Sequence, residues 1–410
     1  KGMKNNMHII IGLIGIVVFL ALAVVFSSDR KNIRWNYVGL LLGIQLVFAF
    51  ILLKTKFGIT VISGISNGFN YLLAQAAEGV NFVFGGFEYI DPENPPFFFN
   101  VLLPIVFISA LIGILQYTKI LPWIINVLGF LISKINGMGR LESYNAVAAA
   151  ILGQSEVFIS LKKELAYIPK QRLYTLTASA MSTVSASIIG AYFALIEPKY
   201  VVTAVVLNLF GGFIIASIIN PYRVDEKEDK LIVQESEASK QSFFEVLGEY
   251  ILDGFKVAVI VGAMLIGYIA IIALLNGLVA GIFSGLSGGQ IDWDFQTIIG
   301  FIFAPFAFLA GIPWSDAVQS GSVMATKLLS NEFVAMQSLS EVKGMSEHAK
   351  GIVSVFLVSF ANFSSIGIIS GAIKSLNNEK GDMVARFGLK LLFGATLVSF
   401  ISSAIAGFFI

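Results

Sequence analysis

Long apolar runs, separated by short polar breaks, repeat along this chain from one end to the other. Many are about twenty residues long, which is enough for a helix to cross the ~30 Å hydrocarbon core of a bilayer. We predict spanning helices at residues 8–26, 35–53, 98–117, 172–195, 200–219, 254–275, 352–373 and 384–409. Because the apolar stretches are continuous rather than alternating, the pattern favours an all-α polytopic membrane protein with about eight spans over a transmembrane β-barrel.

Two apolar segments are interrupted by polar residues in a way that a simple span does not allow. Residues 142–163 and 313–336 each contain two arms that are too short to cross the bilayer. The arms meet at the polar sequences Gly153-Gln154-Ser155-Glu156 and Ser330-Asn331-Glu332. A non-helical tip at membrane depth is tolerated only where protein or a water-filled cavity surrounds it. We therefore predict two re-entrant hairpins.

Further segments are too polar or too short to span. Residues 59–84 interleave apolar and polar side chains, which predicts an amphipathic helix at the membrane interface. Shorter apolar pieces cover 121–135 and 295–309, and residues 221–241 form a strongly charged loop. Lys and Arg gather in the loops of one side, which predicts that this side is cytoplasmic and that both termini lie outside.

The predicted elements occur in the same order twice. Hairpin, polar-interrupted span and ordinary span follow one another over 140–219 and again over 313–409. One intervening span inverts the second copy relative to the first. Inverted repeats with short broken segments in matching places indicate a transporter whose binding site lies between the repeats.

Composition removes several function classes. Hydrophobic residues make up 56% of the chain and charged residues 13%, cysteine is absent, there are two histidines, and the net charge is +1. Thiolate metal sites, thiol catalysis and histidine-based metal or catalytic centres are thereby excluded or disfavoured. The near-neutral charge gives no support for a nucleic-acid partner. We expect neither a resident metal nor a cofactor.

Glu156 and Glu332 are the main candidates for chemistry, because an unpaired carboxylate at membrane depth costs several kcal/mol. They match in the two repeats, which favours solute binding, and proton carriage by one of them, over a purely structural hydrogen bond. Gln154 and Asn362 supply amide donors and acceptors, although single amides in spans equally join helices. Phe360, beside Asn362, is a candidate to stack on or wall off a planar solute, although Phe is abundant in this chain and position alone says little.

Small hydroxyl residues also interrupt two of the predicted spans. They are Ser182, Thr183, Ser185, Ser364 and Ser365. Such residues suit a broken helix that exposes backbone carbonyls to a cation, and they equally suit close helix packing.

At these residues the sequence resembles the concentrative nucleoside transporter family, and in particular its bacterial nucleoside permeases. The resemblance runs nearly end to end. Its most specific stretches are Gly137-Met138-Gly139-Arg140-Leu141-Glu142-Ser143, Gly153-Gln154-Ser155-Glu156, Ala180-Met181-Ser182-Thr183-Val184-Ser185, Met324-Ala325-Thr326-Lys327, Asn331-Glu332-Phe333-Val334-Ala335 and Ser359-Phe360-Ala361-Asn362-Phe363-Ser364-Ser365-Ile366-Gly367.

The resemblance implies a homotrimer in the bacterial inner (plasma) membrane that imports nucleosides by an elevator mechanism. It implies a scaffold domain over 1–120 and a cytoplasmic loop with a scaffold span over 222–285. The transport domain would comprise a first repeat over 121–221 and a second over 286–410.

The resemblance also assigns roles to individual residues. Gln154 and Glu156 would bind the nucleobase, Ser155 would assist through water, and Ile188 would pack against the base. Glu332 would bind the ribose hydroxyls together with Asn362 and Ser365, and Phe360 would contact and gate the sugar side.

One departure concerns the coupling ion. Sodium-coupled relatives carry an asparagine five residues before the hairpin glutamine, where this chain has Ala149. Their sodium lies near positions that correspond to Leu152, Thr183 and Val184. Because the asparagine is missing and two carboxylates are available, the sequence favours proton coupling over sodium-coupled symport.

Two other functional classes, ion channels and integral-membrane enzymes, fit the sequence less well than transporters. An ion channel would line a continuous pore, but here the polar residues cluster in repeated broken segments and no filter-like motif is present. An integral-membrane enzyme lacks support, since no paired-aspartate metal motif or nucleophile–histidine pair occurs. We therefore expect a secondary transporter and no enzyme.

Overall fold

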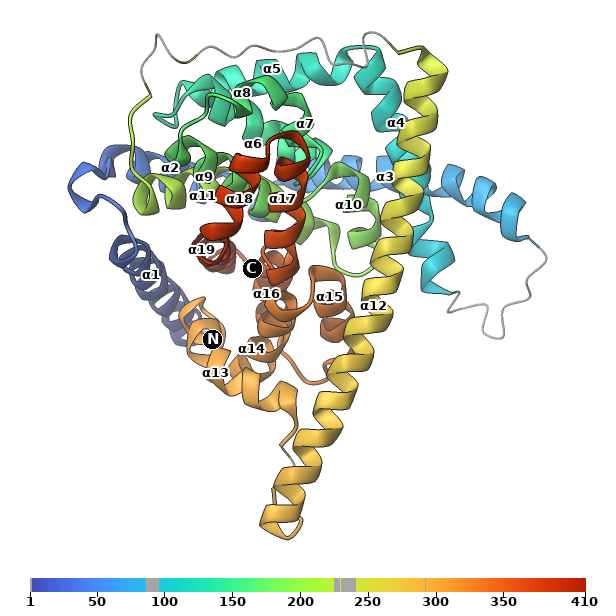
Figure 1. Ribbon diagram of the computed structural model, residues 1–410. Coiled ribbons are helices and arrows are strands. Elements are labelled where there is room, and N and C mark those ends of the chain that lie inside the picture. Colours follow the sequence, from blue (N-terminus) through green and yellow to red (C-terminus); the bar gives the residue numbers. More distant parts are fainter. Residues whose placement is uncertain (1, 86–95, 225–228, 230–240, 292) are drawn as a thin grey trace.

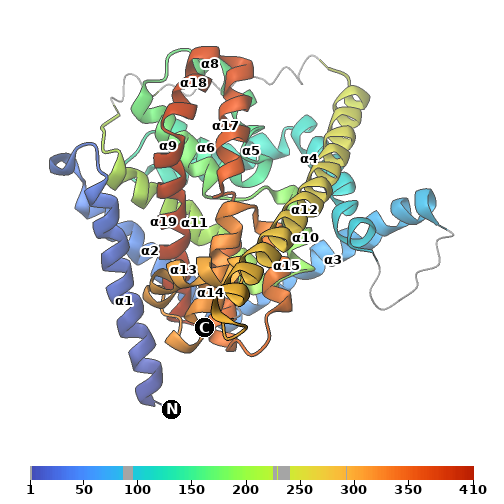
Figure 2. The same cartoon turned by 60° about the horizontal axis from the view of Figure 1, so that its bottom comes forward.

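The computed structural model describes residues 2–85, 96–224, 229, 241–291 and 293–410, and within these ranges it consists of helices and connecting loops without strands (Figures 1 and 2). Most of the charged loop predicted at 221–241 lies outside the described residues, as do residues 86–95. The all-α expectation is confirmed.

The first three helices are α1 (Gly2–Val25), α2 (Trp35–Lys54) and α3 (Lys56–Phe84). The hydroxyl oxygen of Thr55 caps α3 by accepting a hydrogen bond from the Gly58 amide. In Figures 1 and 2, α3 extends away from the helical bundle, and large side chains near its end, such as Phe82, are exposed. Its polar and apolar residues therefore do not pack as a spanning core helix would.

Two further helices pack along each other over much of their length: α4 (Pro104–Tyr117), preceded by the short helix η2 (Phe98–Leu102), and α12 (Phe243–Ser287). Small residues permit the approach, since a Cβ atom on Gly113 would lie 2.7 Å from the ring of Tyr250. The span predicted at 254–275 was too short. A capping box of Ser242 and Glu245 starts α12 earlier, and apolar sequence continues it to 45 residues.

Two of the three most buried spans are α11 (Pro198–Ile219) and α19 (Gly388–Gly407), which contact each other. Both α1 and α2 pack on this pair. The Phe19 ring of α1 stacks on Phe400 of α19 at 4.9 Å between ring centroids, and the Gln45 amide of α2 donates to the Leu207 carbonyl at 2.7 Å. The N-terminal helices are thus tied to the interior of the molecule.

Both predicted hairpins are present. Hairpin 1 comprises α6 (Arg140–Leu152) and α7 (Val157–Ser160), and hairpin 2 comprises α14 (Trp314–Leu329) and α15 (Glu332–Glu341). Helix α13 (Phe295–Leu309) precedes hairpin 2 and turns into α14 through a bend of 116°.

Each hairpin is followed by a helix that is broken near its middle. Break 1, residues 182–185, separates α9 (Lys170–Met181) from α10 (Ala186–Phe193). Break 2, residues 358–362, separates α16 (Glu347–Leu357) from α17 (Phe363–Leu376). The remaining helices are η1 (Arg30–Asn32), α5 (Ile120–Ser133), α8 (Lys162–Leu165) and α18 (Asn378–Arg386).

The predicted count of about eight spans is confirmed. Seven helices or helix runs in the described part of the chain are long and apolar enough to cross a membrane, and the bent α13–α14 pair can be counted as an eighth. The predicted span 352–373 is not a continuous helix, because break 2 divides it into two short pieces. The remaining seven predicted spans each have a counterpart.

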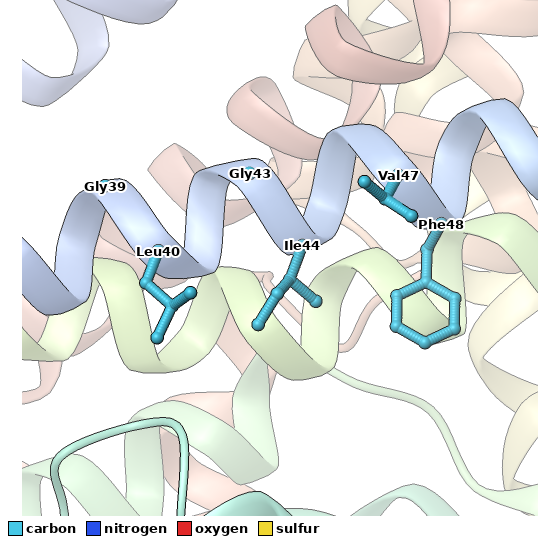
Figure 3. Close-up of a pocket in the computed structure, with 6 residues that line it drawn as sticks. All are labelled: Gly39, Leu40, Gly43, Ile44, Val47 and Phe48. Carbon is cyan, nitrogen blue, oxygen red and sulfur yellow. The ribbon is translucent and has the colours of Figure 1, made fainter.

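An apolar groove runs along the outward face of α2 (Figure 3). It is lined by Gly39, Leu40, Gly43, Ile44, Val47 and Phe48. A Cβ atom added to either glycine would meet nothing within 4 Å among the described residues, so the groove is open at the glycines, whereas the Phe48 ring stacks on Phe210 of α11 at 5.5 Å between ring centroids. The groove has no polar group to orient a solute, and the candidate site lies elsewhere.

Candidate functional site

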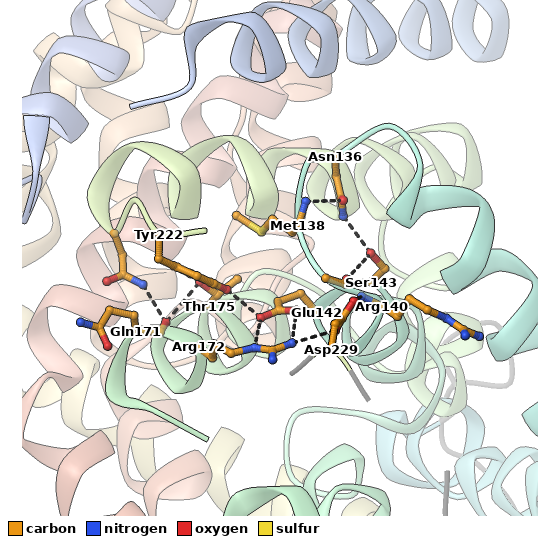
Figure 4. A network of polar contacts seen from close by, with 12 residues as sticks. Asn136, Met138, Arg140, Glu142, Ser143, Gln171, Arg172, Thr175, Tyr222 and Asp229 are labelled. Carbon is orange, nitrogen blue, oxygen red and sulfur yellow. Dashed lines mark hydrogen bonds and ion pairs between the residues drawn. The ribbon is translucent and has the colours of Figure 1, made fainter. Parts of the chain in front are cut away.

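A buried ion-pair network holds the base of hairpin 1 (Figure 4). The Arg172 guanidinium, at the start of α9, donates to both oxygens of the fully buried Glu142 carboxylate at 2.6 and 2.8 Å. The Tyr222 hydroxyl donates to the same carboxylate at 2.8 Å, and Arg172 also pairs with Asp229 at 3.1 Å. Bidentate geometry fixes the guanidinium plane, so α6 and α9 are locked together below the tip.

The tip of hairpin 1 depends on a glycine. Gly153 ends α6 with φ of +112°, a conformation that L side chains rarely adopt. A Cβ atom there would lie 2.8 Å from a carboxylate oxygen of Glu156. The turn therefore brings the Glu156 carboxylate back over the backbone, where the Ser155 hydroxyl donates to it at 3.0 Å.

The first tip packs against break 1. The Ser185 side chain caps α10 and its hydroxyl reaches the Ile151 carbonyl of hairpin 1 at 3.5 Å. The hydroxyl oxygens of Ser182 and Thr183 are buried and have no hydrogen-bond partner among the residues that the structure describes. Break 1 therefore presents unused polar atoms beside the tip, as a solute or cation site requires.

The second tip buries its carboxylate. Asn331 caps α15 by accepting a hydrogen bond from the Val334 amide at 3.0 Å, and Glu332 occupies the first helical position. Glu332 is 5% exposed. Its Oε1 accepts from the Tyr192 hydroxyl at 3.0 Å, and its Oε2 lies 3.4 Å from the Asn362 amide nitrogen. One carboxylate thus joins hairpin 2 to α10 of the first repeat and α17 of the second.

Break 2 is supported by groups from three other helices. The Phe360 amide donates to the Thr183 carbonyl of break 1 at 3.0 Å, and the Asn208 side chain donates to the Val358 carbonyl at 2.7 Å. Asn362 caps α17 by accepting from the Ser365 amide at 2.9 Å. Backbone groups freed by the break therefore find partners, which a helix interrupted at membrane depth needs.

Lys327 supplies the third support of break 2. It is fully buried in α14, and its Nζ donates to the Phe356 carbonyl at 2.7 Å and to the hydroxyls of Ser359 and Ser399 at 2.6 and 3.3 Å. All three ammonium protons are used in this way. These hydrogen bonds join α14 to the end of α16 and to α19.

Buried side-chain atoms without a hydrogen-bond partner among the described residues occur in several parts of the molecule, and four of them lie at the tips and beside the breaks. They are Gln154 Oε1, Ser182 Oγ, Thr183 Oγ1 and Ser365 Oγ. Buried polar atoms are normally paired, so a group of unpaired ones marks the place where a polar ligand binds. Together with the exposed Glu156 and the buried Glu332, they can accept and donate hydrogen bonds to a solute that carries several polar groups.

The residues predicted from the sequence fall into two groups. Gln154, Ser155 and Glu156 form the first tip, with the buried Ile188 on α10 close by in the fold. Glu332 and Asn362 are in contact at the second tip, and Phe360 and Ser365 flank Asn362 in break 2 and α17.

Sequence reasoning missed Tyr192, which contacts Glu332 directly and is fully buried. The available signal was a hydroxyl within an apolar segment, four residues after Ile188 and therefore on the same face of a helix.

Comparison with known proteins gives a consistent result over the whole chain. Family models described as the Na⁺ dependent nucleoside transporter C-terminus and N-terminus match residues 200–407 and 14–87, and one described as nucleoside recognition matches 98–199. A purine nucleoside transport protein of Bacillus subtilis is 36% identical over 98% of this chain and 100% of its own length. A nucleoside permease of Helicobacter pylori is 29% identical over 97% of both chains.

Solved structures agree with the fold. The structure of CNTnw in an inward-facing, substrate-bound state is similar with a TM-score of 0.90 at 28% identity, and 98% of each chain is covered. A doubly substituted CNTnw in an outward-facing state is similar with a TM-score of 0.91 at 28% identity and the same coverage.

Proposed function

The chain belongs to the concentrative nucleoside transporter family, a family of multi-pass membrane transporters and not of enzymes, and from that premise we propose that it imports nucleosides together with protons. Membership of this family supports cation-coupled nucleoside import, and the bacterial permease relatives place the protein in the inner membrane. We propose in addition that the coupling cation is a proton, and we assign the residues that bind the nucleoside.

The observation that carries the proposal is the Glu332 carboxylate, held between the repeats by Tyr192 and Asn362. A buried carboxylate at membrane depth requires a role, and this one sits where groups from both repeats converge. Its contacts come from neutral donors, so it retains the capacity to accept a hydrogen bond from a sugar hydroxyl.

We assign the nucleobase to the first tip and the ribose to the second. Gln154 offers an unpaired carbonyl oxygen, and Glu156 is exposed and bound only by the neighbouring Ser155, so both are free to meet a base edge. Ile188 would pack against the base. Glu332 and Asn362 would bind the ribose with Ser365, whose hydroxyl has no partner, and Phe360 would close the sugar side.

The moving part of the elevator would contain both hairpins and both broken helices, in line with the transport-domain segments 121–221 and 286–410. Helices α4 and α12 pack mainly on each other and suit the scaffold. The sequence assigned 1–120 to the scaffold. Because α1 and α2 pack on α11 and α19, we propose that these two helices travel with the transport domain instead. A homotrimer of such protomers remains our expectation.

Proton coupling is favoured by the surroundings of Ala149. This residue offers no side-chain oxygen, and its carbonyl already accepts the Gly153 amide at 2.9 Å. The second candidate is sodium coupling, which is favoured by the unpaired hydroxyls of Ser182 and Thr183 beside the first tip. Backbone carbonyls with such hydroxyls provide the oxygen donors that a hard cation prefers.

Uptake of tritiated adenosine and uridine into proteoliposomes separates these possibilities. Under proton coupling, an acidic exterior drives concentrative uptake without sodium, and a protonophore collapses it. Uptake that follows an inward sodium gradient and ignores the protonophore would replace the proton with sodium. Absence of nucleoside uptake under either gradient would overturn the proposed function.

A further inference from the structure

Lys327 is a fully buried cation whose hydrogen-bond partners are neutral oxygens. Its Nζ lies 2.7 Å from the Phe356 carbonyl oxygen, 2.6 Å from Ser359 Oγ and 3.3 Å from Ser399 Oγ. Among the described residues, no ion pair involves this lysine. A charge removed from water needs groups that replace its hydration, so these oxygens and the face of the Phe356 ring, 4.6 Å from Nζ, have to stabilise it.

The Phe356 carbonyl is available because α16 ends there. In an uninterrupted helix this oxygen would accept a hydrogen bond from the amide four residues later, which is that of Phe360. That amide instead donates to the Thr183 carbonyl of break 1 at 3.0 Å. The last carbonyls of a helix also carry a partial negative charge that favours cations. Break 2 thus creates an acceptor for a cation, and Lys327 reaches it from α14.

The two hydroxyls are arranged to accept from the same cation. The oxygens of Ser359 and Ser399 lie 3.0 Å apart, and Ser399 Oγ is 3.3 Å from the Ala395 carbonyl oxygen. Ser399 can therefore donate to this carbonyl and Ser359 to Ser399, which leaves lone pairs on both hydroxyl oxygens for Nζ. Carbonyl and hydroxyl oxygens that converge in this way replace the water around a cation.

Break 1 offers similar oxygens but no such side chain. The hydroxyls of Ser182 and Thr183 are buried and unpaired among the described residues. The adjoining hairpin arm, α6, has Ala149 three residues before its end, whereas α14 has Lys327 two residues before its end. The two repeats therefore differ in whether the hairpin arm brings its own cation to the break.

We propose that break 2 is a binding site for an ammonium-type cation, and that this chain fills it permanently with the side chain of Lys327. The ligand class is a primary ammonium, because its three N–H donors match one carbonyl and two hydroxyl acceptors. The fixed charge holds break 2, and with it Asn362 of the second tip, in place without an ion from solution. The first part of this inference does not depend on the proposed function.

The variant Lys327→Ala gives the main test. It removes the side chain beyond Cβ, which n-propylammonium matches atom for atom. Thermal unfolding of the detergent-solubilised variant is compared in equal concentrations of propylammonium chloride, tetramethylammonium chloride and propan-1-ol. We expect propylammonium alone to raise the Tm, by about 2 °C at roughly ten times its Kd. No rise, or an equal rise with tetramethylammonium or propan-1-ol, would overturn the inference, since salt or filled volume would then be sufficient.

Two matched variants accompany this measurement. In Lys327→Met the side chain fills the site, and in Lys350→Ala the lost lysine belongs to a half-exposed ion pair with Glu347, so neither should respond selectively to propylammonium. A selective response by either would contradict a site at break 2. If Lys327→Ala does not fold, Lys327→Gln decides the question. Its neutral amide should leave the Tm as low as that of Lys327→Met, and a Tm equal to that of the unaltered protein would overturn the need for a charge.

Nucleoside counterflow tests the consequence for the second tip. It requires no ion gradient, so the amine, which dissipates pH gradients, does not interfere. Lys327→Ala should exchange tritiated adenosine or uridine more slowly than the unaltered protein, and propylammonium should raise its rate toward the unaltered value. A restored Tm without a restored rate would refute the role of the charge at the second tip. If the unaltered protein shows no counterflow, the proposed function fails, and the Tm measurement still decides whether break 2 is a cation site.

Discussion

The two hairpin tips carry equivalent carboxylates in very different surroundings. Glu156 at the first tip is exposed and accepts a hydrogen bond from the adjacent Ser155, whereas Glu332 at the second tip is buried and held by Tyr192 and Asn362. Before a solute arrives, the second tip is thus organised by distant parts of the chain and the first by its own turn. Repeats of similar topology thus provide a rigid half and an adaptable half of the proposed site.

Removal of the carboxylate from the rigid half should have the largest effect. Glu332→Ala deletes the proposed sugar acceptor and leaves two buried donors unpaired, which together lower nucleoside uptake by about a thousandfold. Tritiated adenosine or uridine uptake measures this loss. The control Glu341→Ala alters an exposed carboxylate of the same helix and should leave uptake intact. Near-normal uptake by Glu332→Ala would remove Glu332 from the site.

The second-largest effect is expected on stability, when the hydrogen bonds of Lys327 behind the second tip are removed. Lys327→Met leaves the buried Phe356 carbonyl without a donor, whereas the Ser359 and Ser399 hydroxyls keep their contact with each other at 3.0 Å, so the free energy of unfolding should fall by about 2 kcal/mol. Thermal unfolding of the detergent-solubilised protein follows the change. Lys350→Met, which removes a half-exposed i,i+3 ion pair with Glu347, should change stability by less than about 0.5 kcal/mol. Equal effects of both variants would contradict the role given to Lys327.

The function of the first tip, the adaptable half, should be sensitive to its backbone conformation. Gly153→Ala places a residue with a Cβ atom at φ of +112°, close to the Glu156 carboxylate. The strain of about 1–2 kcal/mol and the displaced carboxylate should weaken the apparent affinity for nucleosides about tenfold. The apparent affinity is obtained from uptake measured over a range of nucleoside concentrations. Gly79→Ala on α3 is the control and should leave the affinity unchanged, because the added methyl meets nothing within 4 Å. An unchanged affinity would show that the first tip does not depend on this turn.

The smallest effect is expected at Ser155. Its hydroxyl donates a single hydrogen bond to an exposed carboxylate, so Ser155→Ala should raise KM about threefold and leave the maximal rate unchanged. The control Ser160→Ala removes a hydroxyl that bonds only to the Val157 carbonyl of the same short helix. A loss as large as that of Glu332→Ala would erase the distinction between the two tips.

Features encoded locally were predicted well from the sequence. The hairpins were recognised because short apolar arms meet at Gly153 and Ser330, and most spans were recognised from their length. The predicted span at 352–373 was recognised as polar-interrupted from Ser364 and Ser365, but the observed break at 358–362 begins six residues earlier, where the sequence carries only one serine and one amide. The carbonyl of Phe356, just before the break, accepts a hydrogen bond from Lys327 of α14, and the carbonyl of Val358 accepts one from Asn208 of α11.

Contacts between distant segments could not be predicted in this way. Tyr192 and Glu332 are 140 positions apart, and nothing in the local pattern around Tyr192 marks it as the partner of a carboxylate. The length of α12 was also underestimated, since the helix continues on both sides beyond the span that a bilayer requires. Such features depend on tertiary packing, which overrides local pattern.

The hydrogen bond from the Phe360 amide to the Thr183 carbonyl has a consequence for how this site can be mapped. Both partners are main-chain atoms, so alanine substitutions across the two breaks would leave this hydrogen bond in place. An alanine scan would therefore not reveal that residues 183 and 360 form it. Proline at position 360 would remove the donor. The link between the repeats is therefore independent of side-chain identity, and sequence drift at these two positions need not weaken it.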